Sequence, residues 1–81
     1  MGKEKRMNKL VKQYLEESYK YYITYEENSI SDMEYDYLCK QILEGYKELS
    51  PQDKALVSVD SLEAGTGFDI TPSTYLQAGV L

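Results

Sequence analysis

The side chains best suited to ligand chemistry gather in one stretch, residues 19–37. This stretch contains six of the nine tyrosines in the sequence, together with Asp32 and Asp36. Aromatic ring faces suit a flat heterocycle, and carboxylates accept hydrogen bonds from ribose hydroxyls or an amide NH2. The sequence contains no histidine, which excludes Ser-His-Asp triads and Cys-His dyads within one chain. The composition of this stretch therefore points to binding rather than catalysis.

A long amphipathic helix over residues 3–25 is expected to carry the first part of this stretch. Apolar, aromatic and small residues recur there at spacings of three and four, which is the pattern of one helical stripe. Charged residues fall off the stripe, and no Gly or Pro interrupts it after Gly2. The stripe consists of Met7, Leu10, Val11, Tyr14, Leu15, Ser18, Tyr21, Tyr22 and Tyr25.

A second helix is predicted over residues 32–49, after a short polar connection at residues 26–31. Ser31 followed by Glu34 is a capping-box pattern, and Ile30 and Tyr35 occupy the positions of a hydrophobic staple. Gly45 weakens this helix without ending it. Cys39 lies on the apolar stripe of the helix, so we expect it to be a buried core residue rather than a nucleophile.

A short loop between two amphipathic helices typically produces an antiparallel hairpin. In such a hairpin, the end of the first helix lies beside the start of the second. Aromatic rings and two carboxylates would then meet at one end, from Tyr21, Tyr22, Asp32, Tyr35 and Asp36. The same pattern has a purely structural interpretation, because first-turn aspartates stabilise the helix dipole and tyrosines often fill a core. No metal is expected, since two ligands from one helix rarely suffice.

The remaining chain is predicted to form one more short helix and an irregular tail. Ser50 followed by Pro51 is a helix-start signal and favours a helix over residues 51–57. Gly65, Gly67 and Pro72 disfavour long regular structure beyond it, so residues 58–81 are expected to be irregular or partly disordered, with one helical turn over 60–64. The fold class is all-α: an antiparallel helical hairpin plus a short third helix, with residues 1–57 as the folded domain.

Net charge and composition limit the classes of partner that are expected. The 81-residue chain has a net charge of −5, although residues 1–20 hold six of its nine basic residues. Direct DNA binding is therefore not expected. No apolar run has the length of a membrane span, and the N-terminus lacks the apolar segment of a signal peptide. The sequence predicts a cytoplasmic protein without a membrane association.

The two halves of the tyrosine-rich stretch resemble a known module. The run Tyr21-Tyr22-Ile23, a short polar loop, and the run ISDMEYDYL over residues 30–38 are similar to the N-terminal Ia domain of bacterial NAD-dependent DNA ligases. The similarity covers roughly residues 10–50. It implies a helical hairpin that binds the nicotinamide mononucleotide (NMN) half of NAD. The family positions that bind NMN match Tyr21, Tyr22, Asp32, Tyr35 and Asp36.

The resemblance ends before the catalytic part of such ligases. The nucleophilic K-x-D-G motif of the family is absent, since Lys54 stands in the sequence DKAL. The chain is therefore expected to bind NMN or NAD weakly and to have no enzymatic activity alone, with a separate nucleotidyltransferase or another protein as its partner. The alternative is a protein–protein interaction hairpin that has lost its ligand. The two hypotheses differ in whether Asp32, Tyr35 and Asp36 face an open pocket or a closed core.

Overall fold

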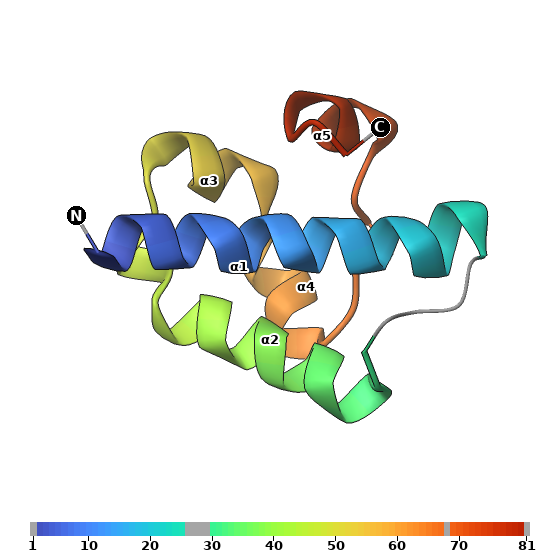
Figure 1. Cartoon of the computed structure of the whole chain (residues 1–81), viewed down its shortest axis with the longest axis horizontal. Helices are drawn as coiled ribbons and strands as arrows, with labels where there is room; N and C mark the ends of the chain where they lie inside the picture. Colours follow the sequence, from blue (N-terminus) through green and yellow to red (C-terminus); the bar gives the residue numbers. More distant parts are fainter. Residues whose placement is uncertain (1, 26–29, 68, 81) are drawn as a thin grey trace.

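The computed structural model describes residues 2–25, 30–67 and 69–80, and the side chains of residues 2–5 are not described. Residues 26–29, most of the predicted polar connection, lie outside the described residues. Helices account for all the regular structure in the described ranges, which confirms the predicted all-α class. The helices α1 (Gly2–Tyr19) and α2 (Asp32–Glu44) run in opposite directions and form the predicted antiparallel hairpin (Figure 1).

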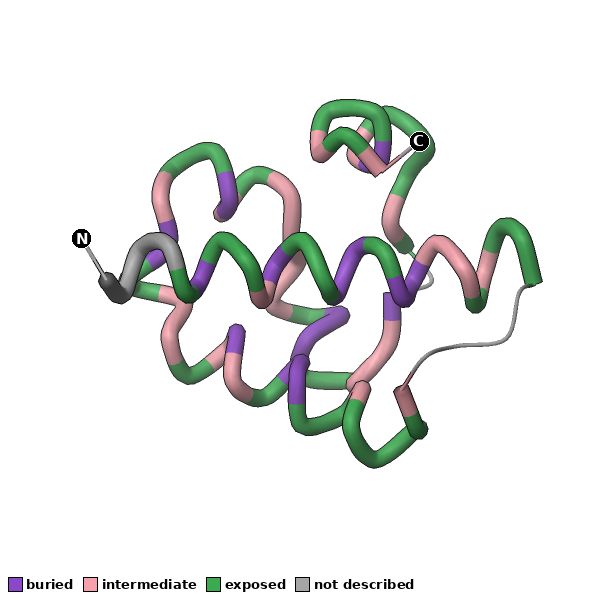
Figure 2. The backbone as a smooth tube through the Cα atoms, viewed as in Figure 1, coloured by how far each residue is buried: buried purple, intermediate pink, exposed green. Residues whose placement is uncertain are grey.

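The first helix changes its form near its end. α1 is followed without a break by a π-helical segment, η1 (Lys20–Thr24), and Tyr25 ends it in the left-handed region at φ 58°. This end projects beyond the start of α2 (Figure 1) and is largely exposed (Figure 2). Tyr25, predicted to continue the apolar stripe, is instead 83% exposed, because this end of the helix projects beyond the start of α2 (Figure 1).

The second helix begins as predicted but ends earlier. α2 stops at Glu44, Gly45 is its C-cap, and the 3₁₀-helix η2 (Tyr46–Glu48) follows. A Cβ atom at Gly45 would lie 2.6 Å from Cε of Met7, so the glycine permits a close approach of α1. The third helix, α3 (Pro51–Leu56), begins at Ser50 as expected, and the Ser50 hydroxyl accepts a hydrogen bond from the Asp53 N–H.

The segment after residue 57 differs from the predicted irregular tail. It forms α4 (Val59–Ala64), where one helical turn was expected, and α5 (Pro72–Gln77), where none was. Leu62 of α4 and Tyr75 of α5 are each 1% exposed. Both belong to the same core as the buried residues of α1 and α2, so the tail packs on the hairpin.

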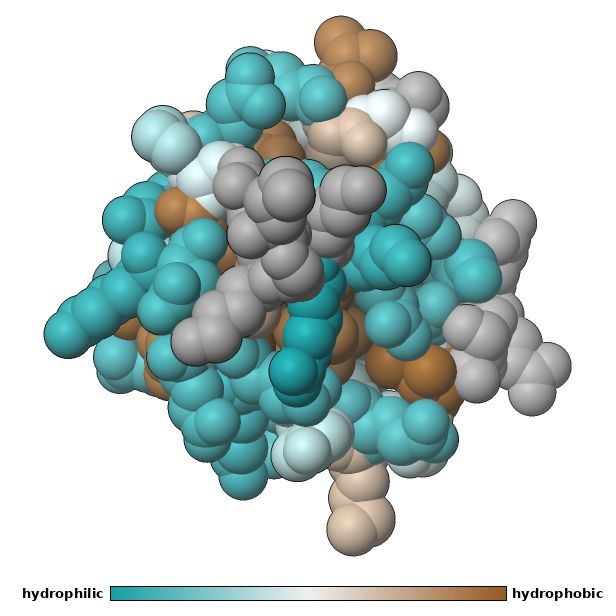
Figure 3. Space-filling model, turned by 60° about the vertical axis from the view of Figure 1, so that its left-hand side comes forward, coloured by the Kyte–Doolittle hydropathy of each residue, from teal (hydrophilic) through white to brown (hydrophobic). Residues whose placement is uncertain are grey.

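The core lies where α1, α2 and α4 face one another (Figure 2). Cys39 is fully buried there, as predicted. Hydrophilic side chains cover most of the face in Figure 3, where hydrophobic groups reach the surface in separate areas. The buried hydrophobic residues are Met7, Val11, Tyr14, Leu15, Leu38, Cys39, Ile42, Leu49, Leu62 and Tyr75.

Candidate functional site

A cavity of about 230 Å³ opens at the end of the hairpin where the tyrosine-rich stretch was predicted to converge. It lies between η1, the start of α2 and the turn that follows α4. Four of the five predicted binding residues line it, and Asp36 is the exception. The lining residues are Tyr21, Tyr22, Ile30, Ser31, Asp32, Tyr35, Gly65 and Thr66.

The π-helical turn positions the two tyrosines of the first helix. Tyr21 and Tyr22 lie in η1, and their rings meet edge to face, with centroids 4.8 Å apart and an interplanar angle of 68°. In an edge-to-face pair, each ring keeps at least one face free of contact with the other ring. Tyr21 is 54% exposed. The pair can therefore present an aromatic face to a ligand in the cavity, and π-helical turns are frequent at functional sites.

The capping box holds the start of α2. The Ser31 hydroxyl accepts a hydrogen bond from the Glu34 N–H at 3.2 Å, and the Glu34 carboxylate accepts one from the Ser31 N–H at 3.3 Å. Asp32, in the first turn, is exposed and lines the cavity. An ionised carboxylate has only acceptor sites, so Asp32 suits ligand hydroxyl or amide N–H groups.

Tyr35 is a fixed wall of the cavity. Its hydroxyl lies 2.5 Å from Oγ of Ser18, and the proton of Ser18 is directed to the Tyr14 carbonyl oxygen at 2.7 Å. The Tyr35 hydroxyl is therefore the donor in its bond with Ser18. Its ring also packs on Tyr14, with centroids 5.7 Å apart. Burial raises the pKa of Tyr35 and outweighs the opposing effect of the Ser18 hydrogen bond, so the phenol stays protonated.

The third wall comes from a turn that the sequence did not identify as part of the site. Gly65 ends α4 with φ 70°, and the N–H of Thr66 donates to the carbonyl oxygen of Ser61 at 3.0 Å, which is a Schellman motif. The Gly-Thr-Gly sequence is thus a helix C-cap. The Tyr14 hydroxyl donates to the Thr66 carbonyl oxygen at 2.7 Å and ties this turn to α1.

Gly67 allows the same turn to approach the hairpin closely. Gly67 is buried, and a Cβ atom there would lie 2.5 Å from Oγ of Ser18 and 2.9 Å from the Tyr35 hydroxyl. Only a residue without a side chain fits in this space. Gly65 and Gly67, on either side of Thr66, are the sequence feature that makes this contact possible.

Asp36 lies beside the cavity without lining it. Its Oδ2 atom forms an ion pair with Nζ of Lys40 at 3.2 Å, one helical turn later. Both side chains are more than half exposed, so the pair contributes little to stability. The Oδ1 atom of Asp36 lies near Gly65, where a Cβ would be 2.7 Å away. The structure thus brings Asp36 against the outside of the third wall.

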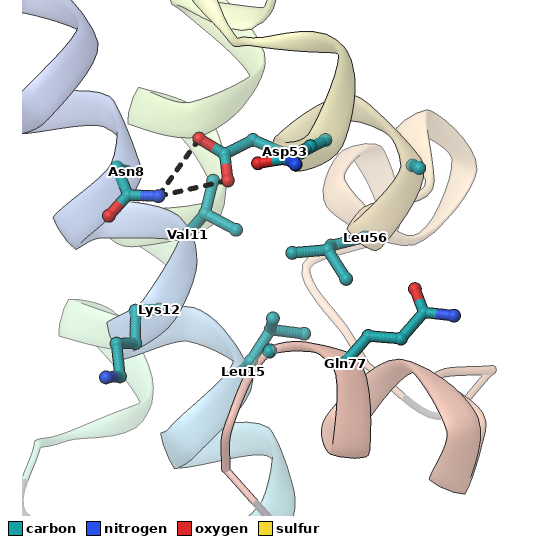
Figure 4. A pocket seen from close by; sticks show the side chains of 10 residues that line it. Asn8, Val11, Lys12, Leu15, Asp53, Leu56 and Gln77 are labelled. Carbon is teal, nitrogen blue, oxygen red and sulfur yellow. Dashed lines mark hydrogen bonds between the residues drawn. The ribbon is translucent and has the colours of Figure 1, made fainter.

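A larger cavity, of about 460 Å³, lies between α1, α3 and α5 (Figure 4). The Nδ2 group of Asn8 donates to both carboxylate oxygens of the buried Asp53, at 3.1 and 3.3 Å. The buried carboxylate of this cavity is therefore already bound by Asn8, and the cavity lining contains no aromatic ring. The smaller cavity offers both an aromatic surface and an exposed carboxylate.

Two findings concern the whole described part of the chain. Within residues 2–25, 30–67 and 69–80, no group of three metal-ligating side chains could hold a metal ion. In the same ranges, no helix has the length and apolar character needed to cross a membrane.

No protein-family model, curated protein or solved structure matches the chain. Any function proposed for it therefore rests on its own residues and geometry.

Proposed function

We propose that this chain binds the nicotinamide mononucleotide half of NAD in the cavity at the hairpin end. One observation carries the proposal: Tyr21, Tyr22, Asp32 and Tyr35, separated by up to 14 positions in the sequence, line a single cavity. The similarity of this stretch to the ligase Ia domain supports the same ligand. In this proposal Tyr21 or Tyr22 stacks on the nicotinamide ring, and Asp32 accepts hydrogen bonds from the ribose hydroxyls.

The size of the cavity favours a mononucleotide over a whole dinucleotide. Its volume of about 230 Å³ is below the range of roughly 300–1,000 Å³ that is usual for small-molecule sites. The cavity therefore holds the ring and part of the ribose, and the phosphate extends into solvent. An adenylate half of NAD would lie outside the cavity, where a separate nucleotidyltransferase could contact it.

The expected affinity is low. Stacking of a base on an aromatic ring contributes about 1–3 kcal/mol, and each hydrogen bond adds a net of roughly 0.5–1.5 kcal/mol. The entropic cost of association offsets much of this gain. We expect a dissociation constant near 1 mM, which corresponds to about −4 kcal/mol. The proposed role is binding, without catalysis of DNA sealing by this chain alone.

A titration followed by amide chemical shifts tests the proposal. NMN added to the labelled full chain up to several times the expected dissociation constant should shift amides of η1, the start of α2 and the turn at residues 65–67. Ribose 5-phosphate is the matched control, because it has a ribose and a phosphate but no ring that can stack on a tyrosine, and it should cause smaller shifts. If NMN leaves all these amides unmoved, the proposed function is wrong.

A second function, a protein-interaction hairpin, is favoured by large exposed side chains of the hairpin. Tyr25, Met33 and Tyr37 are 83%, 82% and 63% exposed, respectively. Met33 and Tyr37 lie one turn apart on α2, and adjacent exposed apolar side chains commonly mark interfaces. The two functions separate experimentally, because Met33→Ser and Tyr37→Ser should abolish partner binding, while the binding of NMN to the cavity persists.

A further inference from the structure

The hydroxyl group of Thr66 makes no hydrogen bond to any described residue. Thr66 lines the cavity, and its Oγ1 atom is shielded from water and has no hydrogen-bond partner among the described residues. More than about nine in ten buried polar groups are paired in folded proteins, so each exception calls for an explanation. The other such atom, the Tyr75 hydroxyl, belongs to a residue that does not line this cavity.

The backbone of Thr66 is held on both sides. Its N–H donates to the Ser61 carbonyl oxygen at 3.0 Å, and its carbonyl oxygen accepts from the Tyr14 hydroxyl at 2.7 Å. The next residue, Gly67, lies tightly against Ser18. The freedom that remains is rotation about χ1, which moves the hydroxyl among staggered positions around Cβ. A ligand in the cavity can therefore recruit this hydroxyl without movement of the backbone.

We propose that Thr66 is a ligand-binding residue and that its hydroxyl donates a hydrogen bond to the carboxamide oxygen of the nicotinamide ring. This inference rests on the proposed function. The carboxylate of Asp32 is an acceptor only, so it cannot bind a carbonyl oxygen. The Ser31 hydroxyl lies 3.2 Å from the Glu34 carboxylate, and the Tyr35 hydroxyl is bonded to Ser18. Thr66 lines the cavity with a shielded hydroxyl that has no partner among the described residues, whereas Tyr21 and Tyr22 are assigned to the ring face of the ligand.

In this proposal, the C-terminal segment is a part of the binding site. Figure 1 shows the chain leaving α4 and passing α1 on its way to α5. The turn at Gly65–Gly67 stands at the start of this passage and supplies the third wall of the cavity. A hairpin without this segment would lack both the wall and the Thr66 donor.

Two variants of the full chain test the role of the hydroxyl. Thr66→Val keeps the shape of the side chain and removes the hydroxyl, whereas Thr66→Ser keeps the hydroxyl. We expect Thr66→Val to raise the dissociation constant for NMN about three- to tenfold, and Thr66→Ser to change it less than about twofold. The melting temperature of Thr66→Val should equal or exceed that of the wild type, because a methyl group replaces an unpaired buried hydroxyl.

The outcomes separate this inference from the proposed function. If the wild type binds NMN and Thr66→Val binds it equally well, the role of Thr66 is wrong and the proposed function stands. A clearly lower melting temperature for Thr66→Val would mean that the hydroxyl is paired in the free protein, which also overturns the role. If the wild type does not bind NMN, the proposed function and the role of Thr66 both fall.

Discussion

Replacement of Gly67 by alanine is expected to loosen the C-terminal segment from the hairpin. The new Cβ atom would lie 2.5 Å from Oγ and 2.9 Å from Cβ of Ser18, and 2.9 Å from the Tyr35 hydroxyl. Ser18 cannot move aside easily, because it is fully buried on α1 and its hydroxyl is bonded to Tyr14 and Tyr35. The substitution therefore forces the turn outward and breaks contacts on both sides.

The magnitude follows from two contributions. Overpacking of a buried position costs about 1–3 kcal/mol, and loss of the hydrogen bond between Ser18 and Tyr35 adds roughly 0.5–1.5 kcal/mol. The free energy of unfolding should fall by about 1.5–4.5 kcal/mol. For a domain of this size, a loss of 1 kcal/mol lowers the melting temperature by roughly 4–8 °C. Thermal unfolding followed by circular dichroism should thus show a decrease of at least about 6 °C.

Gly79→Ala is the matched control. Gly79 has φ 78°, and no described atom lies within 4 Å of the position that an alanine Cβ would take, so alanine there meets backbone strain but no clash. The strain corresponds to about 1–2 kcal/mol, and the amide resonances of Ser18 and Tyr35 should not shift. In Gly67→Ala those resonances should shift strongly. A Gly67→Ala protein with the stability of the wild type would contradict the packing of this turn against α1.

Three further substitutions and conditions give separate tests. Leu38→Ala should lower the free energy of unfolding by about 2–4 kcal/mol in chemical denaturation, because Leu38 is only 4% exposed in the core. Asp32→Asn should weaken NMN binding more than Asp36→Asn in the same titration, because Asp32 lines the cavity and Asp36 pairs with Lys40. Burial raises the pKa of Cys39 from its ordinary value of 9.0 to about 11 and that of Tyr75 from 10.0 to about 12. As the pH rises, the unfolded chain loses these protons before the folded chain does. The free energy of unfolding should therefore stay constant below pH 9 and fall between about pH 9 and 12. A free energy of unfolding that rises over this interval would contradict the burial of both groups.

Local signals allowed the hairpin to be predicted. The capping box at Ser31 and Glu34 and the Ser50-Pro51 start signal depend on residues within one turn, and both appear in the structure as expected. The apolar stripes predicted which faces of α1 and α2 are buried, including the burial of Cys39. Each of these features depends on interactions between residues close in the sequence.

The tail contains a local helix-start signal of the same kind. Thr71 followed by Pro72 repeats the start pattern of α3, and the Thr71 hydroxyl caps α5 by accepting a hydrogen bond from the Thr74 N–H. The burial of Leu62 and Tyr75 was harder to predict, because it depends on contacts with residues far away in the sequence. Tyr75 packs edge to face on Tyr19, more than fifty positions earlier, with centroids 5.1 Å apart.

Only two of the three walls of the cavity could be predicted from the sequence, namely η1 and the start of α2. The hairpin topology placed Tyr21 and Tyr22 beside the start of α2, but the π-helical turn that orients them has no sequence signal that we can identify. The third wall, the turn at residues 65–67, could not be predicted, because its place depends on where α4 ends relative to α1. Asp36 lies one turn after Asp32 on the same helix, yet the ion pair with Lys40 and the turn at Gly65 separate its carboxylate from the cavity.

The most direct test of the NMN site is a measurement of intermolecular nuclear Overhauser effects between NMN and the labelled chain. Effects from the nicotinamide ring protons to the ring protons of Tyr21 or Tyr22, and to the methyl group of Thr66, are the predicted result. Effects from the same ligand protons to Leu15 and Leu56 would instead place the ligand in the larger cavity between α1, α3 and α5. That result, or the absence of any effect at saturating NMN, would contradict the account.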